Sequence, residues 1–224
     1  MHPVFLATGL CWAVAYVLII RQGFADRTYG MPIVALCANL SWEFIFSVVR
    51  PVEADAQRIG NFLWLAFDVV IAYTFLRFGR REFPKLSKPV FYGGFAGTLV
   101  LSYLAVDLLC REFENGLGNY AGFADNLMMS GLFVAMLISR GDLRGQSVAI
   151  AALKFVGTIC ASVGYWQYGR TNPHSALFMY LYFGNGILDF VYLSAVVYLR
   201  TRIRNRAGAV PAQRAAQTVA QPTT

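Results

Sequence analysis

The sequence has 224 residues, of which 57% are hydrophobic and 15% aromatic, and its mean hydropathy is +0.51. Charged residues make up 14%, well below the about 25% of soluble domains, so the composition excludes an ordinary soluble protein. The net charge of +7 lies mainly in short segments between apolar runs, which argues against a nucleic-acid partner. We therefore expect an integral, multi-pass membrane protein whose surroundings are the lipid bilayer.

Seven apolar segments follow one another along the chain, each close to the about 20 residues of a transmembrane helix. The sequence thus predicts an all-α bundle of seven transmembrane helices, at residues 4–20, 31–49, 61–76, 89–109, 121–138, 147–166 and 175–199. The third segment is short, and we expect it to extend toward Phe78. The bundle is predicted to occupy residues 1–206, and the Ala-, Gln-, Thr- and Pro-rich residues 207–224 to form a disordered cytoplasmic tail.

Lys and Arg are divided unevenly between the two sides of this predicted bundle. Fourteen of them follow the first, third, fifth and seventh spans, and four fall on the other side. Cytoplasmic loops are enriched in Lys and Arg, so we expect the N-terminus outside and the C-terminus in the cytoplasm. Lys154 alone lies inside a span, the sixth.

The segment from Asn39 to Glu43 places an amide, an indole and a carboxylic acid inside the second span. Asn39 and Glu43 are four residues apart and share a helix face, and no Lys or Arg lies within a turn of Glu43. An ionisable residue at this depth is costly and usually functional. Asp189 in the last span is likewise preceded by Asn185 at four residues. We predict that Glu43 and Asp189 are catalytic and that they face one cavity.

Further polar and aromatic residues in the spans are candidates for substrate contact. Tyr182, Asn185, Asp189 and Tyr192 form a stripe along one side of the last predicted helix. Asp68 follows Trp64 by one turn. Two roles are open for Asp68, contact with the substrate and an ion pair with Lys154. The predicted substrate-binding residues are Asn39, Trp42, Trp64, Asp68, Asn126, Tyr182 and Asn185.

Other reactive residue types carry little functional signal. Asp107 and Asp125 lie near the predicted outer ends of their spans, where water is close, so we expect solvated, structural roles. The four cysteines are scattered without a CxxC pair and are interpreted as small core residues. The sequence contains no DDxxD-type cluster, P-loop or Rossmann glycine pattern, so we predict no metal and no cofactor.

Acids in an apolar, aromatic environment are suited to acid catalysis. A carboxylic acid kept from water stays protonated near neutral pH and can protonate a weak base. An epoxide oxygen or a terminal alkene is such a base, and the carbocation formed is quenched by ring closure of a folded prenyl chain. Aromatic faces stabilise the migrating charge. The alternative is that both acids only hydrogen-bond neighbouring helices.

Asn39, Trp42 and Glu43 in the second of seven spans, together with Asp189 in the last, resemble a known family. The chain is similar in these residues, in length and in topology to the integral-membrane terpene cyclases of meroterpenoid and indole-terpenoid biosynthesis. The resemblance implies a cyclase that acts on a prenylated aromatic or indole substrate, which is often epoxidised. Such an enzyme is an isomerase or a lyase. It also implies that Glu43 and Asp189 are the two essential acids and that no obligate protein partner is needed.

Three other classes share some of these features. A retinal protein needs a Schiff-base lysine in its last helix, and the seventh span has none. A small-solute or proton-coupled transporter would use buried acids as a proton relay, although we find no internal repeat that such a carrier often has. A receptor or assembly scaffold would leave both acids dispensable for turnover.

Overall fold

The computed structural model describes residues 2–52, 55–114 and 116–219, with the side chains of residues 55, 56, 114 and 206–219 left out. The described chain contains helices and no strand, which confirms the all-α prediction. The elements are α1 (Pro3–Asp26), α2 (Ile33–Phe44), the π-helix η1 (Ile45–Val49), α3 (Asp55–Phe78), the 3-10 helix η2 (Gly79–Glu82), α4 (Lys88–Glu114), α5 (Asn119–Arg140), α6 (Val148–Tyr168) and α7 (Ala176–Val219).

The helices match the seven predicted segments, and six of them are long and apolar enough to cross a membrane. α3 is longer than predicted at its start and ends at Phe78, as expected. The remaining segment, Ile33–Val49, is apolar but shorter, with 12 α-helical residues followed by five in a π-helix. Its length is near the lower limit of about 17 residues for a span, so the seventh crossing stays a prediction.

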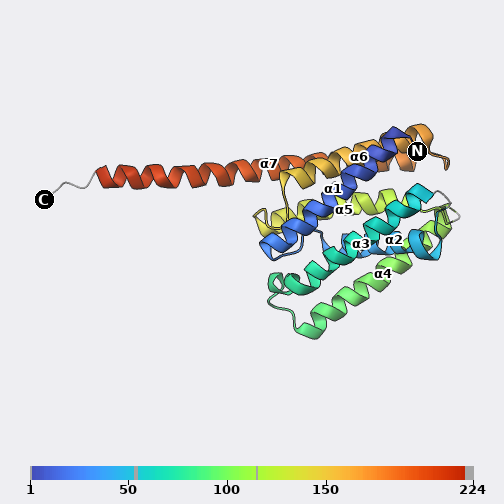
Figure 1. Cartoon of the computed structure of the whole chain (residues 1–224), viewed down its shortest axis with the longest axis horizontal. Coiled ribbons are helices and arrows are strands. Elements are labelled where there is room, and N and C mark those ends of the chain that lie inside the picture. Colours follow the sequence, from blue (N-terminus) through green and yellow to red (C-terminus); the bar gives the residue numbers. More distant parts are fainter. Residues whose placement is uncertain (1, 53–54, 115, 220–224) are drawn as a thin grey trace.

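The helices pack so that five of them can surround a common interior. α1 packs against α3 and α6, and α2 packs against α3, α4 and α5 (Figure 1). α7 packs against both α5 and α6. The main apolar cluster draws on all seven α-helices and includes Leu36, Ile71, Phe133 and Tyr192. α2 is held inside the bundle by its partners, which explains why most of its side chains are buried.

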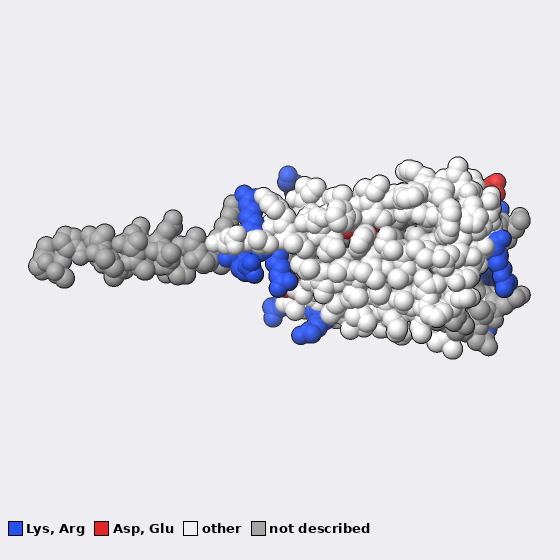
Figure 2. All heavy atoms as spheres, turned by 90° about the horizontal axis from the view of Figure 1, so that it is seen from above, with Lys and Arg blue, Asp and Glu red and all other residues white. Residues whose placement is uncertain are grey.

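The outer surface of the bundle is apolar between two charged ends. Large hydrophobic side chains on different helices point outward, among them Leu10, Leu101, Ile138 and Ile187. Figure 2 shows Lys and Arg at the two ends of the helical body, with a band almost free of them between. This pattern is that of a protein whose middle lies in hydrocarbon. The outside location of the N-terminus stays a prediction.

The last helix is longer than a membrane span. The backbone of α7 is helical to Val219 and extends beyond the other helices (Figure 1). We predicted disorder for residues 207–224, of which residues 220–224 lie outside the described part of the chain. The boundary of the bundle at residue 206 therefore stays a prediction.

Asp107 is held at the end of the bundle where α2 ends and α5 begins. Its carboxylate accepts a hydrogen bond from Arg50 Nη2 at 2.6 Å and forms an ion pair with Arg111 Nε at 2.9 Å. Arg50 and Arg111 remain partly exposed, with side chains 28% and 66% accessible. These ion pairs agree with the structural role predicted for Asp107.

We predict that Asp107→Asn is tolerated. The amide oxygen still accepts a hydrogen bond, and partly exposed ion pairs contribute only about 0–1 kcal/mol to the free energy of unfolding. Thermal unfolding of the detergent-solubilised variant should therefore stay within a few degrees of the wild type. Loss of folded protein would contradict the peripheral location of this acid.

Candidate functional site

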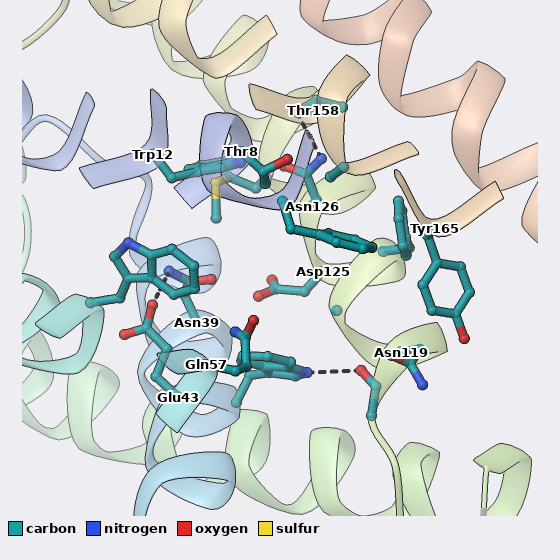
Figure 3. Close-up of a pocket in the computed structure, with 18 of the residues that line it drawn as sticks. Thr8, Trp12, Asn39, Glu43, Gln57, Asn119, Asp125, Asn126, Thr158 and Tyr165 are labelled. Atoms are coloured by element: carbon teal, nitrogen blue, oxygen red, sulfur yellow. Dashed lines mark hydrogen bonds between the residues drawn. The ribbon is translucent and has the colours of Figure 1, made fainter. Parts of the chain in front are cut away.

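A cavity of about 260 Å³ lies inside the bundle (Figure 3). This is close to the lower end of the about 300–1,000 Å³ range of small-molecule pockets. Its described walls come from α1, α2, α3, α5 and α6 and from the loop residue Gly118, whereas α4 and α7 contribute no lining residue. The predicted site residues among the lining are Asn39, Trp42, Glu43, Trp64 and Asn126.

Glu43 lies at this cavity and belongs to a small polar network. The side chain is 3% exposed, and its Oε1 accepts hydrogen bonds from Tyr16 Oη at 3.1 Å and from Asn39 Nδ2 at 3.3 Å. The Asn39 amide also contacts the Tyr16 hydroxyl and donates to Asp68 Oδ2 at 2.8 Å. The predicted i, i+4 pairing of Asn39 and Glu43 is thereby confirmed.

The network holds two carboxylic acids and no cation. Glu43 and Asp68 are joined through the Asn39 amide, their carboxyl groups also interact directly, and no ion pair to either acid occurs among the described residues. Two neighbouring carboxyl groups away from water cannot both be ionised, because their charges would repel each other without compensation. Glu43 Oε2 and Asp68 Oδ1 are buried and have no hydrogen-bond partner among the described residues. At Glu43, which lines the cavity, a proton can therefore be presented to a ligand.

Trp42 is fixed against the loop that precedes α5. Its Nε1 donates a hydrogen bond to the carbonyl oxygen of Gly118 at 2.9 Å (Figure 3), and its ring packs on Phe46 at 4.7 Å between centroids. Gly118 has φ +78°, and a Cβ there would lie 2.1 Å from the Phe46 ring. Only glycine fits this close approach, which brings the first turn of α5 to the cavity.

Aromatic rings make up much of the cavity wall. They come from five helices, α1, α2, α3, α5 and α6, which means that rings surround the space rather than cover one side. Such faces attract positive charge and have no lone pair that reacts readily with a carbocation. The lining aromatic residues are Phe5, Trp12, Tyr16, Trp42, Trp64, Phe123 and Tyr165.

The structure corrects the prediction for Asp125. We expected a solvated residue, but Asp125 is 7% exposed and lines the cavity. The expectation failed because the position of a residue near the end of a predicted span does not show which other segments cover that part of the helix. The loop at Gly118 is packed under Phe46, so the first turns of α5 are enclosed by protein rather than by water.

Asp189 lies behind the cavity wall and not on it. Its Oδ1 accepts from Lys154 Nζ at 2.5 Å, and both side chains are almost fully buried. The ammonium also donates to Ser130 Oγ at 2.5 Å and to Asn126 Oδ1 at 3.2 Å. Lys154 therefore pairs with Asp189 and not with Asp68, and the prediction that Glu43 and Asp189 face one cavity is wrong for Asp189.

The remaining residues of the predicted stripe on α7 also face protein. Asn185 Nδ2 donates to the carbonyl oxygens of Phe123 at 3.0 Å and Leu181 at 2.8 Å. Tyr182 donates to the carbonyl oxygen of Pro173 at 3.1 Å. The stripe packs on α5 and α6, so Tyr182 and Asn185 support the wall, and the substrate contact predicted for them has no counterpart in this cavity.

Several lining residues were not predicted from the sequence. Trp12 and Tyr16 are four residues apart on α1, and Tyr16 donates to Glu43. The same i, i+4 spacing that singled out Asn39 and Glu43 would have found this pair. Thr158 on α6 accepts from Asn126 Nδ2 at 3.1 Å, a contact that no sequence pattern indicates.

The described residues contain no group of three or more His, Cys, Asp or Glu side chains arranged to hold a metal ion. Glu43 is instead held by an amide donor and a hydroxyl donor. This arrangement can give or accept a proton.

Comparison with known proteins gives a consistent picture. Residues 2–202 match the family of Pyr4-like transmembrane terpene cyclases. The Pyr4-family terpene cyclase mfmH of Annulohypoxylon moriforme is 34% identical over 199 residues, which cover 84% of this chain and 81% of the relative. Terpene cyclase pyr4 of Aspergillus fumigatus is 29% identical, over 70% of this chain and 67% of its own length.

A third relative is named a synthase and not a cyclase. Asnovolin H synthase nvfL of Aspergillus novofumigatus is 23% identical over 203 residues, which cover 86% of this chain and 83% of the relative. No solved structure matches this chain significantly. The alternative of a small-solute transporter finds no support in these matches.

We predict that Lys154→Met destabilises the fold strongly. The substitution leaves Asp189 buried without its counterion, which typically costs about 3–5 kcal/mol of the free energy of unfolding. The double variant Lys154→Met/Asp189→Leu removes both charges and should recover most of this loss. Thermal unfolding of the single and double variants measures the coupling, and additive losses would contradict a direct pair.

Proposed function

Because this chain belongs to the Pyr4-like transmembrane terpene cyclases, we propose that its cavity closes rings in a prenyl chain by proton transfer from Glu43. The observation that carries this proposal is the Oε2 atom of Glu43, which is buried at an aromatic cavity and has no hydrogen-bond partner in the described part of the chain. An integral membrane cyclase of this family acts on a hydrophobic substrate. A neutral acid is the simplest initiator in such a site.

The proposed substrate is a prenylated aromatic or indole small molecule. The resemblance in the Asn39 to Glu43 segment and the family membership both support this class. A cavity of about 260 Å³ suits the reactive end of a prenyl chain better than a complete molecule of this size. We therefore expect the reactive end, an epoxide or a terminal alkene, to lie near Glu43.

The first step is protonation of the substrate by Glu43. The O–H bond of the acid breaks, and the proton passes to the epoxide oxygen or to the CH carbon of the last C=C bond, which leaves a tertiary carbocation. In the epoxide case the C–O bond opens as the electron pair of a neighbouring alkene forms the first ring bond. The positive charge then moves along the folded chain, and the aromatic rings of the cavity stabilise it.

The neighbours of Glu43 hold the acid in place. Tyr16 and Asn39 donate to Oε1, which leaves Oε2 free to carry the transferred proton. Asp68 shares the Asn39 amide and stabilises the protonated state of the pair, because one proton is retained between the two acids. Asp189 lies behind the wall and holds the Lys154 ammonium. Lys154 in turn donates to Asn126 and so fixes the position of this lining residue.

We predict that Glu43→Gln abolishes ring closure while the amount of folded protein is unchanged. The amide keeps the size of the side chain and can accept from Tyr16, but it has no acidic proton. General acid catalysis contributes about 10²–10⁴-fold, so turnover in membranes should fall by at least about a hundredfold. Retained cyclisation in this variant would rule out Glu43 as the donor.

The substrate class is tested by product analysis. Membranes that contain the full chain are incubated with farnesylated and geranylgeranylated aromatics and indoles, each with and without a terminal epoxide. We expect cyclised products from at least one member. Uptake of a solute into proteoliposomes that depends on Glu43, with no product from any member, would contradict the proposed function.

A further inference from the structure

A second acid of the cavity has no role in the steps described so far. Asp125 projects from α5 toward Asn39 and Glu43 of α2 (Figure 3). Its side chain is 7% exposed, and its Oδ1 is buried with no hydrogen-bond partner among the described residues. Buried polar atoms are nearly always hydrogen-bonded, so an unpartnered oxygen at a cavity is one that a ligand can use.

Asp125 Oδ1 shares this property with Glu43 Oε2 alone among the described lining residues. The two threonine hydroxyls of the wall have protein partners. Thr8 donates to the carbonyl oxygen of Val4 at 3.0 Å, and Thr158 accepts from Asn126. The cavity thus presents two unpartnered carboxyl oxygens, one from α2 and one from α5.

The two acids differ in the charge that surrounds them. Glu43 is grouped with a second acid, Asp68, through the Asn39 amide. Next to Asp125 there is instead a cation, because the following residue, Asn126, accepts a hydrogen bond from the Lys154 ammonium at 3.2 Å. A nearby ammonium offsets part of the cost of burying a carboxylate, whereas a second acid adds to that cost. Asp125 is therefore better placed than Glu43 to receive a proton, and Glu43 is better placed to give one.

We propose that Asp125 ends the reaction by accepting a proton from the cyclised carbocation. This inference rests on the proposed function, since a cyclisation that begins with proton donation returns to a neutral product when a proton leaves. A C–H bond next to the cationic carbon breaks, its electron pair forms a C=C bond, and the proton passes to the Asp125 carboxylate. Which hydrogen faces Asp125 then decides the position of the double bond, so this residue also sets product identity.

Asp125→Asn tests this role through the products rather than through turnover alone. A substrate that the wild type cyclises is supplied to membranes in ¹⁸O-labelled water, and products are analysed by mass spectrometry. The ratio of the wild-type alkene to water-captured or isomeric products should fall at least about tenfold, because a positioned base typically contributes 10²–10⁴-fold. Substrate should still be consumed, in contrast to Glu43→Gln. The matched control Asp107→Asn should keep the wild-type ratio.

Asp125→Ala provides a second, independent readout. The shorter side chain leaves room beside the cavity for a small carboxylate, and formate is the probe. Recovery of the wild-type alkene when formate is added supports proton acceptance, because a purely structural role gives no such recovery. An alkene yield that is equally low with and without formate overturns the proposal, as does an unchanged product ratio in folded Asp125→Asn.

The outcome separates this inference from the proposed function. If the wild type consumes no prenylated substrate, the cyclase proposal itself fails. If the wild type cyclises and Glu43→Gln does not, but Asp125→Asn forms the same products in the same ratio, then Glu43 keeps its role and Asp125 is not the acceptor.

Discussion

The buried ion pair between Lys154 and Asp189 is the interaction on which the cavity depends. α7 packs against both α5 and α6, and this pair connects α6 to α7 at the centre of the bundle. Lys154 also reaches Asn126 and Ser130, so one ammonium joins three helices. A charge in hydrocarbon is tolerated only when it is paired and hydrogen-bonded, which makes this geometry strict. The position of the α5 wall, and of Asp125 on it, follows from that constraint.

The same physical rule separates supporting residues from reactive ones. Lys154 has three oxygen partners, and Asn185 donates to two carbonyl oxygens, so these groups are already engaged. Glu43 and Asp125 are buried to a similar degree, yet each keeps one carboxyl oxygen at the cavity without a hydrogen-bond partner among the described residues. Asn185 Oδ1 and Asp189 Oδ2 are also without a partner in this part of the chain, but they lie behind the wall, so only the oxygens of Glu43 and Asp125 can meet a substrate in the cavity.

The sequence predicts the helices and one side of the site, because both depend on local spacing. Asn39 and Glu43 are one turn apart, so their contact follows from helix geometry alone. Asp189 was assigned to the cavity on similar grounds, but spacing along α7 does not say which neighbour its face meets. Asp125 was misjudged for a related reason, since the fold of the loop at Gly118 determines its burial. Contacts between distant helices are set by packing that one sequence does not display.

The distribution of partnered and unpartnered oxygens also explains how a carbocation survives in this cavity. A cation is captured by any accessible nucleophile, and water is the most common one. Here the threonine hydroxyls of the wall are engaged, and Trp42 directs its N–H to the Gly118 carbonyl oxygen. Seven of the 19 lining residues are aromatic, and their rings stabilise charge without forming a bond. In the proposed reaction the cation therefore persists until it meets a carboxylate, and the distance of that carboxylate from the donor limits how far the charge can travel before the reaction ends.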